Sequence, residues 1–145
     1  MNNSVYICSP CRGDYDKNIK NAVTYCRQVF RLGYLPVAPH IYFPHFMDDT
    51  VPNERERAMK AGSELMLRCA EVWVFGLDKP SERMMEEIAL AIRNNIPVKD
   101  GFVEVVKNTN VIRMRDDLTE SELKSLLEKV DRAPIMTIPK QGDWP

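Results

Sequence analysis

Short hydrophobic runs alternate with amphipathic segments along most of the chain. Residues 4–8, 35–38, 72–75 and 96–99 are short apolar runs bounded by proline, glycine or polar residues, a pattern typical of strands. The segment 72–75, Val-Trp-Val-Phe, is apolar at every position. Because a parallel strand in the middle of a sheet is covered on both faces, we expect this segment to be a central strand.

Segments with helical spacing separate the first three strands. Between about residues 16 and 32 the apolar side chains recur every three or four positions, and Gly33 follows where a left-handed cap is needed. A second helix is predicted over residues 52–69. One of its faces carries mainly small residues that let a helix lie close to a sheet, namely Ala58, Ala61, Gly62, Leu65 and Cys69.

The second half of the chain predicts two more helices and one further strand. Residues 76–80 form a turn, Ser81 can cap a helix, and the helical pattern that follows ends near residues 94–95. Residues 102–106 and 111–114 are both possible strands, of which we expect one to join the main sheet. A capping-box pattern at residues 119–122 predicts a last helix that continues to Val130.

The segment 39–51 has no clear period and is expected to be an ordered loop, serving as a lid or a pocket wall. Its aromatic residues either stack on a ligand or anchor the loop to the core (Tyr42, Phe43, Phe46). His40 follows a proline at a strand end, where it either binds a ligand or caps its own loop. His45 is expected to be structural or exposed.

Repeated strand–helix–strand units predict an α/β fold with an open, mostly parallel sheet of about five strands and helices on both faces, a flavodoxin-like or Rossmann-like three-layer arrangement. We expect one domain over residues 1–132 and a proline-rich tail over residues 133–145. Ligands of such sheets bind in the loops that leave the carboxyl ends of the strands. The loops after the first three strands are therefore expected to share one mouth.

Composition narrows the classes of function. The 145 residues include 20 basic and 21 acidic ones, a net charge of -1, so the overall field does not favour a nucleic-acid polymer. No run approaches the ~18 apolar residues of a membrane span, and the N-terminus does not resemble a secretion signal. We expect a cytoplasmic protein without a membrane partner.

Four cysteines without a secretion signal favour reduced thiols over disulfides. Cys8 and Cys11 form a Cys-x-x-Cys pattern, which is either a redox motif or the packing of Cys8 at a strand end. The redox interpretation is the weaker one, because such a motif normally opens a helix directly and a loop follows here. The remaining cysteines and histidines are too scattered to favour a metal site, and no cofactor is expected.

The loop after the first strand is rich in hydrogen-bond donors. Ser9 offers a hydroxyl group, Arg12 a guanidinium and Gly13 a closely approachable backbone, and the next helix adds its N-terminal amides. This chemistry suits a phosphate group. The alternative is a solvated turn in which Arg12 pairs with Asp14 or Asp16.

Three glutamates begin the helix after the third strand, where acidic residues also complement the helix dipole (Glu82, Glu86, Glu87). Glu87 lies beside buried positions, so desolvation can tune its carboxyl group for chemistry, whereas Glu86 is expected to face solvent. A carboxylate in that place can attack an electrophilic sugar carbon, as it does in retaining glycosyl transfer.

A set of motifs runs in order over residues 4–99, comprising VYICSP at 5–10, RGD at 12–14, APH at 38–40, FP at 43–44, MDD at 47–49, EVWVFG at 71–76 and Ser81-x-x-Met84-x-x-Glu87-Ile88. Together they resemble the nucleoside 2-deoxyribosyltransferase-like superfamily, and most closely its small bacterial and phage branch. The segment with Ser9, Arg12 and Gly13 is also similar to the phosphate loop of the 2′-deoxynucleoside 5′-phosphate N-hydrolases of that superfamily.

The resemblance implies a nucleoside or nucleotide as the small-molecule partner and Glu87 as the catalytic nucleophile, which would form a glycosyl-enzyme ester. It places Ser9, Arg12 and Gly13 at the 5′ side of the nucleotide. The other candidate substrate-binding residues in the three loops are Asp14, His40, Gly76, Asp78, Ser81 and Met84. Relatives usually form dimers or larger assemblies, so a homo-oligomer is expected, with the apolar residues 135–138 of the tail packing on a neighbouring chain.

Two positions depart from the family pattern. Arg83 stands where relatives often carry glycine, and Gly62 or Ser63 stands where the active enzymes place an aspartate. An acid for the leaving base would then come from elsewhere, with Asp48, Asp49 and Asp78 as candidates. The sequence thus leaves two hypotheses: an enzyme that cleaves or exchanges an N-glycosidic bond, and a catalytically silent nucleotide-binding module.

Overall fold

The chain folds around a five-stranded sheet, described here from a computed structural model that covers residues 2–10, 13–106, 109–115 and 128. The strands are β1 (Ser4–Cys8), β2 (Leu35–Val37), β3 (Glu71–Phe75), β4 (Val98–Val106) and β5 (Thr109–Arg115), in the spatial order β2-β1-β3-β4-β5. The first four strands are parallel and β5 is antiparallel to β4. The predicted open, mostly parallel α/β sheet is confirmed.

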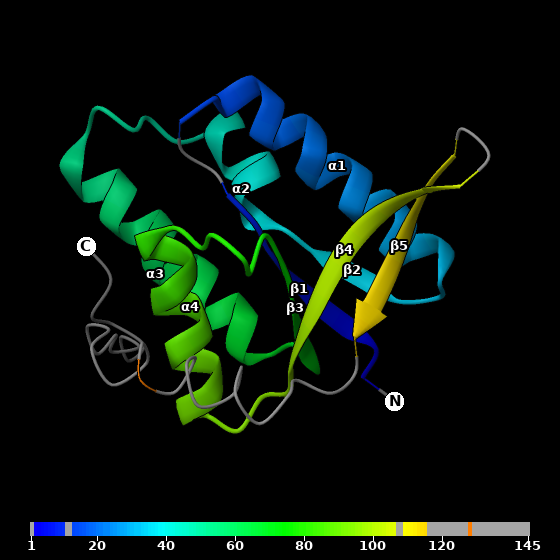
Figure 1. Cartoon of the computed structure of the whole chain (residues 1–145). Helices are drawn as coiled ribbons and strands as arrows, with labels where there is room; N and C mark the ends of the chain where they lie inside the picture. Colours follow the sequence, from blue (N-terminus) through cyan, green and yellow to red (C-terminus); the bar gives the residue numbers. More distant parts are fainter. Residues whose placement is uncertain (1, 11–12, 107–108, 116–127, 129–145) are drawn as a thin grey trace.

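Helices cover both faces of the sheet, which gives three layers (Figure 1). One face carries α1 (Tyr15–Arg31) and the short α2 (Pro39–Tyr42), which continues into a 3₁₀ turn, η1 (Phe43–His45). The other face carries α3 (Pro52–Leu67) and α4 (Glu82–Arg93). Within the described ranges, no helix is long and apolar enough to cross a membrane.

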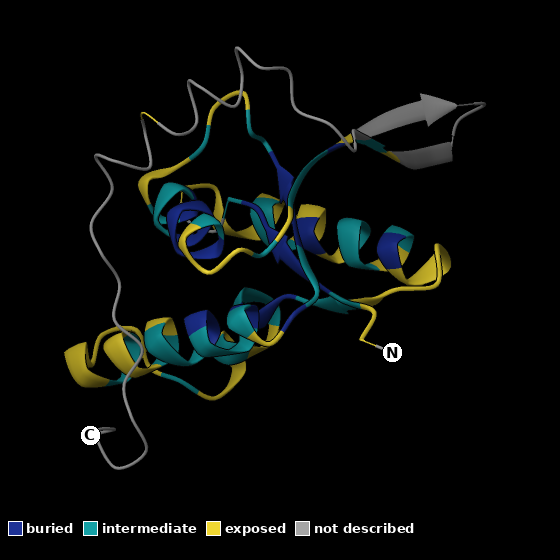
Figure 2. Ribbon diagram, turned by 90° about the horizontal axis from the view of Figure 1, so that it is seen from below, coloured by how far each residue is buried: buried dark blue, intermediate teal, exposed yellow. Residues whose placement is uncertain are grey.

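The alternation of side chains along β1 and β3 divides the core into two clusters, as expected for strands buried on both faces. Tyr6, Cys8, Val72 and Val74 pack toward α3 and α4 together with Met66, Met84 and Ile88. Val5, Ile7, Trp73 and Phe75 pack toward α1 and α2 together with Val29 and Ala38. Figure 2 shows the buried residues concentrated in the strands and on the helix sides that face them.

Caps fix where two of the helices begin and where α1 ends. The Asp14 side chain accepts a hydrogen bond from the amide of Lys17 at the start of α1, and Ser81 accepts one from the amide of Met84 at the start of α4. Gly33 has φ +95° just after α1, where the chain reverses toward β2. The predicted caps at Gly33 and Ser81 are therefore confirmed.

Two sequence predictions are corrected by the fold. Residues 39–51 are not an irregular loop throughout, because Pro39 fixes the first turn of α2 and Pro44 lies in the 3₁₀ turn. The predicted strands 96–99 and 102–106 are one continuous strand, β4, and 111–114 also joins the sheet as part of β5. Both candidate strands belong to the sheet, because a hairpin rather than a helix connects them.

The predicted buried face of the segment 52–69 is confirmed at Gly62 and Cys69 and is wrong at Ala58 and Ala61. Gly62, Ser63 and Met66 are buried, whereas Ala58 and Ala61 are only half-buried and line a groove of about 500 Å³ with residues of the η1 segment. The helix meets α4 through Ser63, whose hydroxyl accepts a hydrogen bond from Arg83, and it packs on the sheet through Met66. The predicted helix at 119–130, the tail at 133–145, Cys11 and Arg12 lie outside the described residues.

Candidate functional site

The carboxyl ends of β1, β2 and β3 are adjacent, and the loops that leave them contact one another. After β1 the chain passes to α1 on one face, and after β3 it passes to α4 on the other face, so the crevice between these two strand ends is a topological switch point. Ser9 after β1 hydrogen-bonds His40 after β2, and Gly76 after β3 packs against Pro10. The three loops share one mouth, as the sequence predicts.

Glu87 is buried at this end of the sheet, with only 8% of its surface exposed. The capped start of α4 places the second turn of the helix over β1. There the Tyr6 hydroxyl donates a hydrogen bond of 3.3 Å to Oε1 of Glu87. The Nε of Arg83, one helical turn earlier, lies 3.2 Å from the same oxygen. One carboxylate oxygen therefore receives both a neutral and a charged donor.

Burial and local donors act in opposite directions on the acidity of Glu87. Desolvation raises the pKa of Glu87 above its ordinary value, while Arg83, the Cys8 thiol and the Tyr6 hydroxyl each lower it. Desolvation is the larger effect, so the net pKa is raised. Burial and the neighbouring Glu87 charge raise the pKa of Tyr6 well above that of a free tyrosine, so Tyr6 remains a hydrogen-bond donor at neutral pH.

Cys8 packs beneath the carboxyl group of Glu87, and its thiol is not activated for redox chemistry. Its side chain is fully buried, and its thiol points toward the carbonyl oxygen of Met84 at 3.9 Å. Burial, followed by the Glu87 charge, raises the pKa of the Cys8 thiol well above its ordinary value. A thiol held in the protonated form is a poor nucleophile, which favours the packing interpretation of this cysteine.

Arg83 joins α4 to α3 across the site. Its guanidinium donates to the carbonyl oxygen of Met59 at 3.2 Å and to the Ser63 hydroxyl at 3.5 Å, and it pairs with Glu86 at 3.4 Å as well as with Glu87. Glu86 is therefore not turned to solvent as expected, since its side chain is only 18% exposed. The ion pair with Arg83 draws Glu86 back along the helix toward α3.

Ser9 and His40 form a second polar pair at the same edge. Ser9 is buried, and its hydroxyl lies 3.2 Å from Nε2 of His40. Burial lowers the pKa of His40 to about 4, so the imidazole is neutral at physiological pH. The hydrogen bond supports a role of His40 in fixing the loops. His45 is exposed, in agreement with the sequence.

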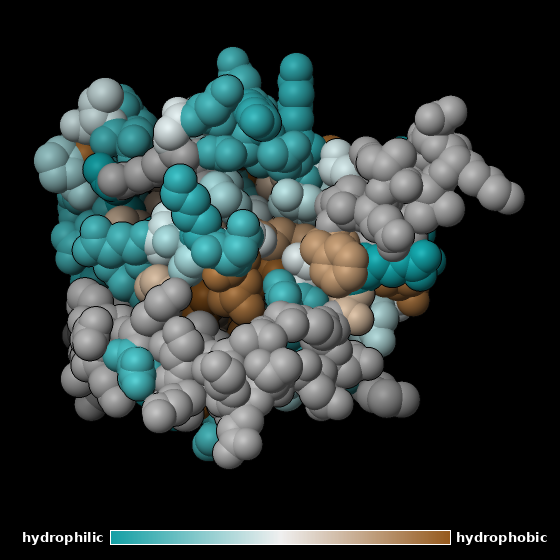
Figure 3. Space-filling view, in the orientation of Figure 1, coloured by the Kyte–Doolittle hydropathy of each residue, from teal (hydrophilic) through white to brown (hydrophobic). Residues whose placement is uncertain are grey.

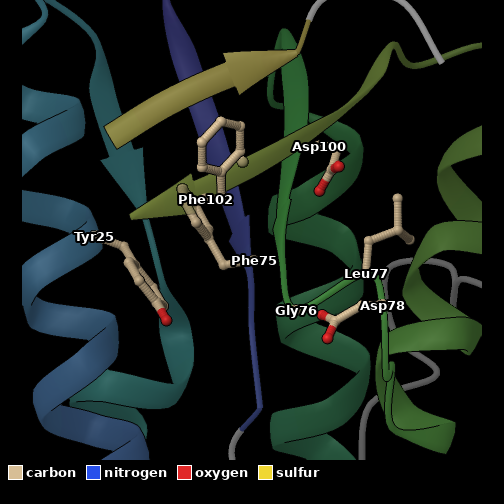
Figure 4. Close-up of a pocket in the computed structure, with 8 residues that line it drawn as sticks. Tyr25, Phe75, Gly76, Leu77, Asp78, Asp100 and Phe102 are labelled. Carbon is tan, nitrogen blue, oxygen red and sulfur yellow. The ribbon is translucent and has the colours of Figure 1, made fainter. Parts of the chain in front are cut away.

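Gly76 and Asp78 line a separate pocket. This pocket, of about 380 Å³, lies where β3 ends beside the first half of β4 (Figure 4), and its lining consists of Tyr25, Phe75, Gly76, Leu77, Asp78, Asp100, Gly101 and Phe102. Glu87 does not line this pocket and lies beside Tyr6 under α4, with Met84 as a buried neighbour. The structure thus divides the predicted site residues into two groups.

The remaining candidates have local structural positions. Gly13 has φ +93°, which suits glycine, and Asp14 caps α1. Ser81 caps α4. Asp48 accepts hydrogen bonds from Thr50, which hold the pKa of its carboxyl group below the ordinary range, and Asp49 pairs with Arg55 at 3.7 Å on the surface. Asp48 is therefore not suited to hold a proton for a leaving base at neutral pH.

Residues 3–100 match a family described as a domain of unknown function (DUF7768). The chain belongs to this family. The matched region of DUF7768 runs from just before β1 into β4, so it contains Tyr6, Arg83 and Glu87 as well as the Ser9–His40 pair. No curated protein matches the sequence.

Tyr6 and Ser63 are partners within this site that the sequence did not single out. Tyr6 was expected only as a strand residue, but the period of two along β1 puts Tyr6 and Cys8 on one face, which was a usable signal. Ser63 was considered only as a replacement for an aspartate. Across the described part of the chain, no group of three or more His, Cys, Asp or Glu side chains is arranged to hold a metal ion.

Proposed function

We propose that this protein is a cytoplasmic enzyme that binds a nucleoside or its 5′-phosphate and cleaves or exchanges the N-glycosidic bond, with Glu87 as nucleophile. The observation that carries the proposal is a buried carboxylate at the switch point of a parallel sheet, held by Tyr6 and Arg83. Its sequence context also resembles that of the nucleoside 2-deoxyribosyltransferase-like superfamily.

The reaction follows from the chemistry of a carboxylate beside a sugar. An oxygen of Glu87 attacks C1′, the C1′–N bond breaks, and its electron pair leaves with the base, which takes a proton from water. The product of this step is a glycosyl ester on Glu87. Water or the N–H of a second base then attacks C1′, and the bond between C1′ and the ester oxygen breaks with its electron pair returning to the carboxylate. The proton lost by the attacking group neutralises the hydroxide left by the first step.

Tyr6 and the raised pKa of Glu87 support this role. A carboxylate with a raised pKa is a stronger base, and it forms a more stable bond to carbon than a fully solvated carboxylate does. The Tyr6 hydroxyl donates to Oε1, which holds the orientation of the carboxyl group. In this proposal Tyr6 is a positioning residue.

The 5′ side of the substrate is assigned to the loop after β1. Ser9 is fixed by His40, and Gly13 has the left-handed backbone that lets a ligand approach closely. Arg12 supplies the charge in this hypothesis. If it binds a 5′-phosphate, a nucleoside monophosphate should raise the melting temperature more than the matching nucleoside, and Arg12→Ala should remove that difference.

The second candidate function is a nucleotide-binding module without catalysis. The Arg83–Glu87 ion pair favours it, because the positive charge stabilises the carboxylate and reduces its tendency to form an ester. Arg83 also spans the gap between α3 and α4, where relatives often have only glycine. In this hypothesis Arg83→Gly would gain cleavage activity that the parent protein lacks.

A homo-oligomer is also proposed. Exposed hydrophobic side chains gather around the end of α1 and the edge strand β2, namely Phe30, Leu32, Tyr34 and Leu35. An exposed apolar area beside an unpaired strand edge favours association between copies. Light scattering at micromolar concentration tests this proposal: we expect a mass above that of one chain, and a monomer would contradict it.

Release of the free base tests the enzymatic proposal. The protein would be incubated with a panel of 2′-deoxynucleosides and their 5′-monophosphates, with and without a second base, and the products separated by chromatography. Glu87→Gln should lower the rate by orders of magnitude and keep substrate binding, because it retains the shape but not the charge. Glu82→Gln, an exposed position in the first turn of α4, is the matched control and should keep the parent rate.

A further inference from the structure

The carboxyl group of Glu87 is nearly closed off from solvent. Its side chain is 11% exposed, and it lines neither of the two cavities described above, of about 380 and 500 Å³. Attack on a sugar carbon requires the reacting atoms to stand about 3–3.5 Å apart with their orbitals aligned. A sugar therefore reaches this carboxyl group only after a neighbouring group has moved.

Arg83 is the neighbour that moves most easily. Three described side chains bond to the carboxyl group of Glu87, and two of them, Tyr6 and Cys8, are buried residues of β1. Moving either of these two would disturb the core. The side chain of Arg83 is 26% exposed, and partly exposed side chains change rotamer rapidly while the backbone stays in place. The departure of Arg83 would therefore leave the sheet intact.

Bonds to two helices hold Arg83 in place. Its guanidinium donates to the Met59 carbonyl oxygen and the Ser63 hydroxyl on α3, and it pairs with Glu86 and Glu87 on α4. It thus bridges the two helices beside the buried carboxyl group. The surface over α3 is mainly hydrophilic on the face seen in Figure 3, so the charged end of Arg83 can also be solvated there.

We propose that Arg83 is the gate of the Glu87 site, an inference that rests on the proposed function. The structure corresponds to the closed state, in which the guanidinium contacts the carboxyl group of Glu87. In the open state the guanidinium leaves Glu87 and its two partners on α3, and it keeps Glu86 as its partner on α4. The carboxyl group of Glu87 is then exposed to a sugar.

Opening also changes the reactivity of Glu87. The charge of Arg83 lowers the pKa of the carboxyl group, so the departure of Arg83 raises that pKa. A more basic carboxylate forms a bond to carbon more readily. Access to Glu87 and its reactivity therefore increase together in the open state.

Carbodiimide labelling of the full-length protein measures access to Glu87. The protonated carboxyl group adds to the carbodiimide, the amine of added glycinamide then attacks the acyl carbon, and a urea leaves as the amide forms. Tandem mass spectrometry locates the amide at single residues. In the parent protein we expect Glu87 to react about tenfold more slowly than the exposed Glu82.

Two variants separate the cover that Arg83 provides from its charge. Arg83→Ala removes both and should raise the labelling rate of Glu87 about tenfold. Arg83→Met removes the charge and keeps an unbranched side chain over the carboxyl group, so the rate should stay within about threefold of the parent rate. Equal rates in the two variants would mean that charge alone controls the reaction, and an unchanged rate in Arg83→Ala would mean that other residues close the site. Either result would overturn the proposal.

Glu71 and Ser63 keep the test decisive if Arg83→Ala loses its fold. Glu71 is half-buried at the start of β3 and pairs with Lys99, so its labelling rate rises only on unfolding. Ser63→Ala removes one anchor of the guanidinium and should by itself raise the labelling rate of Glu87. If the labelling of Glu71 rises in Arg83→Ala, the result for Ser63→Ala decides, and no increase at Glu87 in that variant would overturn the proposal.

The labelling reaction is independent of the N-glycosidic chemistry. The expected rise in Arg83→Ala supports the gate even if neither protein cleaves a nucleoside, and in that case the proposed function fails alone. Cleavage by the parent protein together with equal labelling rates of Glu87 in the parent and in Arg83→Ala would leave the proposed function in place and overturn the gate.

Discussion

Nε of Arg83 lies 3.2 Å from Oε1 of Glu87, one helical turn apart on α4. The pair links Arg83 directly to the carboxyl group that we propose as the nucleophile. Arg83 lowers the pKa of Glu87, yet burial raises it by more. The balance between these two effects determines the pH at which Glu87 is available as a nucleophile.

Arg83→Gln should move the acidic limb of the pH–rate profile upward. Without the guanidinium the pKa of Glu87 rises further, so the carboxylate form appears only at higher pH, with a shift of about one pH unit. Arg83→Lys keeps the positive charge and should retain most of the parent profile. If the acidic limb of the kcat/KM profile lies at the same pH in Arg83→Gln and in the parent, this limb reflects the titration of another group. Glu87 is then not the titrating residue.

The stability of Glu87→Gln relative to the parent should depend on pH. The folded state raises the pKa of Glu87, so this residue contributes stability below its unfolded pKa, and the contribution is lost as pH rises through the folded pKa. Glutamine cannot lose a proton. As the pH rises from 4 to 8 the variant should therefore gain stability relative to the parent, measured by urea unfolding. A stability difference between variant and parent that stays constant over this pH range would mean that burial does not control the pKa of Glu87.

His40 should make the parent protein less stable in acid. Burial lowers its pKa to about 4, so the folded state binds a proton less readily than the unfolded chain with its pKa near 6.5. The stabilising contribution is complete above about pH 6.5 and is lost as pH falls toward 4, up to ~3 kcal/mol in total. His40→Gln should flatten this part of the stability curve. An imidazole resonance of His40 that titrates near pH 6.5 in the folded protein would contradict the prediction.

Two glycines should respond in opposite ways to alanine. Gly62 lies inside α3, and a Cβ atom there would meet only ordinary contacts at 4.0 Å, so Gly62→Ala should stabilise the protein by roughly 0.5–1 kcal/mol through helix propensity. Gly101→Ala should destabilise by roughly 1–3 kcal/mol, because its methyl group would overlap Phe75. Thermal unfolding of both variants measures the contrast. Equal effects would show that Phe75 does not need the space at Gly101.

The sheet could be predicted from the sequence because its strands are short, apolar and bounded by clear turn residues. Val72 to Phe75 show this best: every side chain is buried, as the unbroken apolar run predicts. The continuous strand β4 was not predicted, because Gly101 normally weakens a strand. Its role depends on Phe75, which is distant in sequence and contacts Gly101 only in the folded sheet.

The candidate site could be predicted only in part. Sequence context singled out Glu87 beside buried positions, and the structure buries it. The reach of Arg83 to Met59 and Ser63 was not predictable, because it depends on how closely α3 and α4 approach. The same holds for the pocket lined by Gly76 and Asp78, since Tyr25, Phe75 and Asp100 lie on three separate elements.

Covalent trapping tests the central claim that Glu87 is the nucleophile. A 2′-fluorinated 2′-deoxynucleoside slows breakdown of the glycosyl ester more than its formation, so the intermediate should accumulate. Mass spectrometry of the treated protein should show one added fluorinated sugar, located in the peptide that contains Glu87 and absent from Glu87→Gln. An adduct on another residue, or no adduct with any purine or pyrimidine analogue, would contradict the assignment of Glu87.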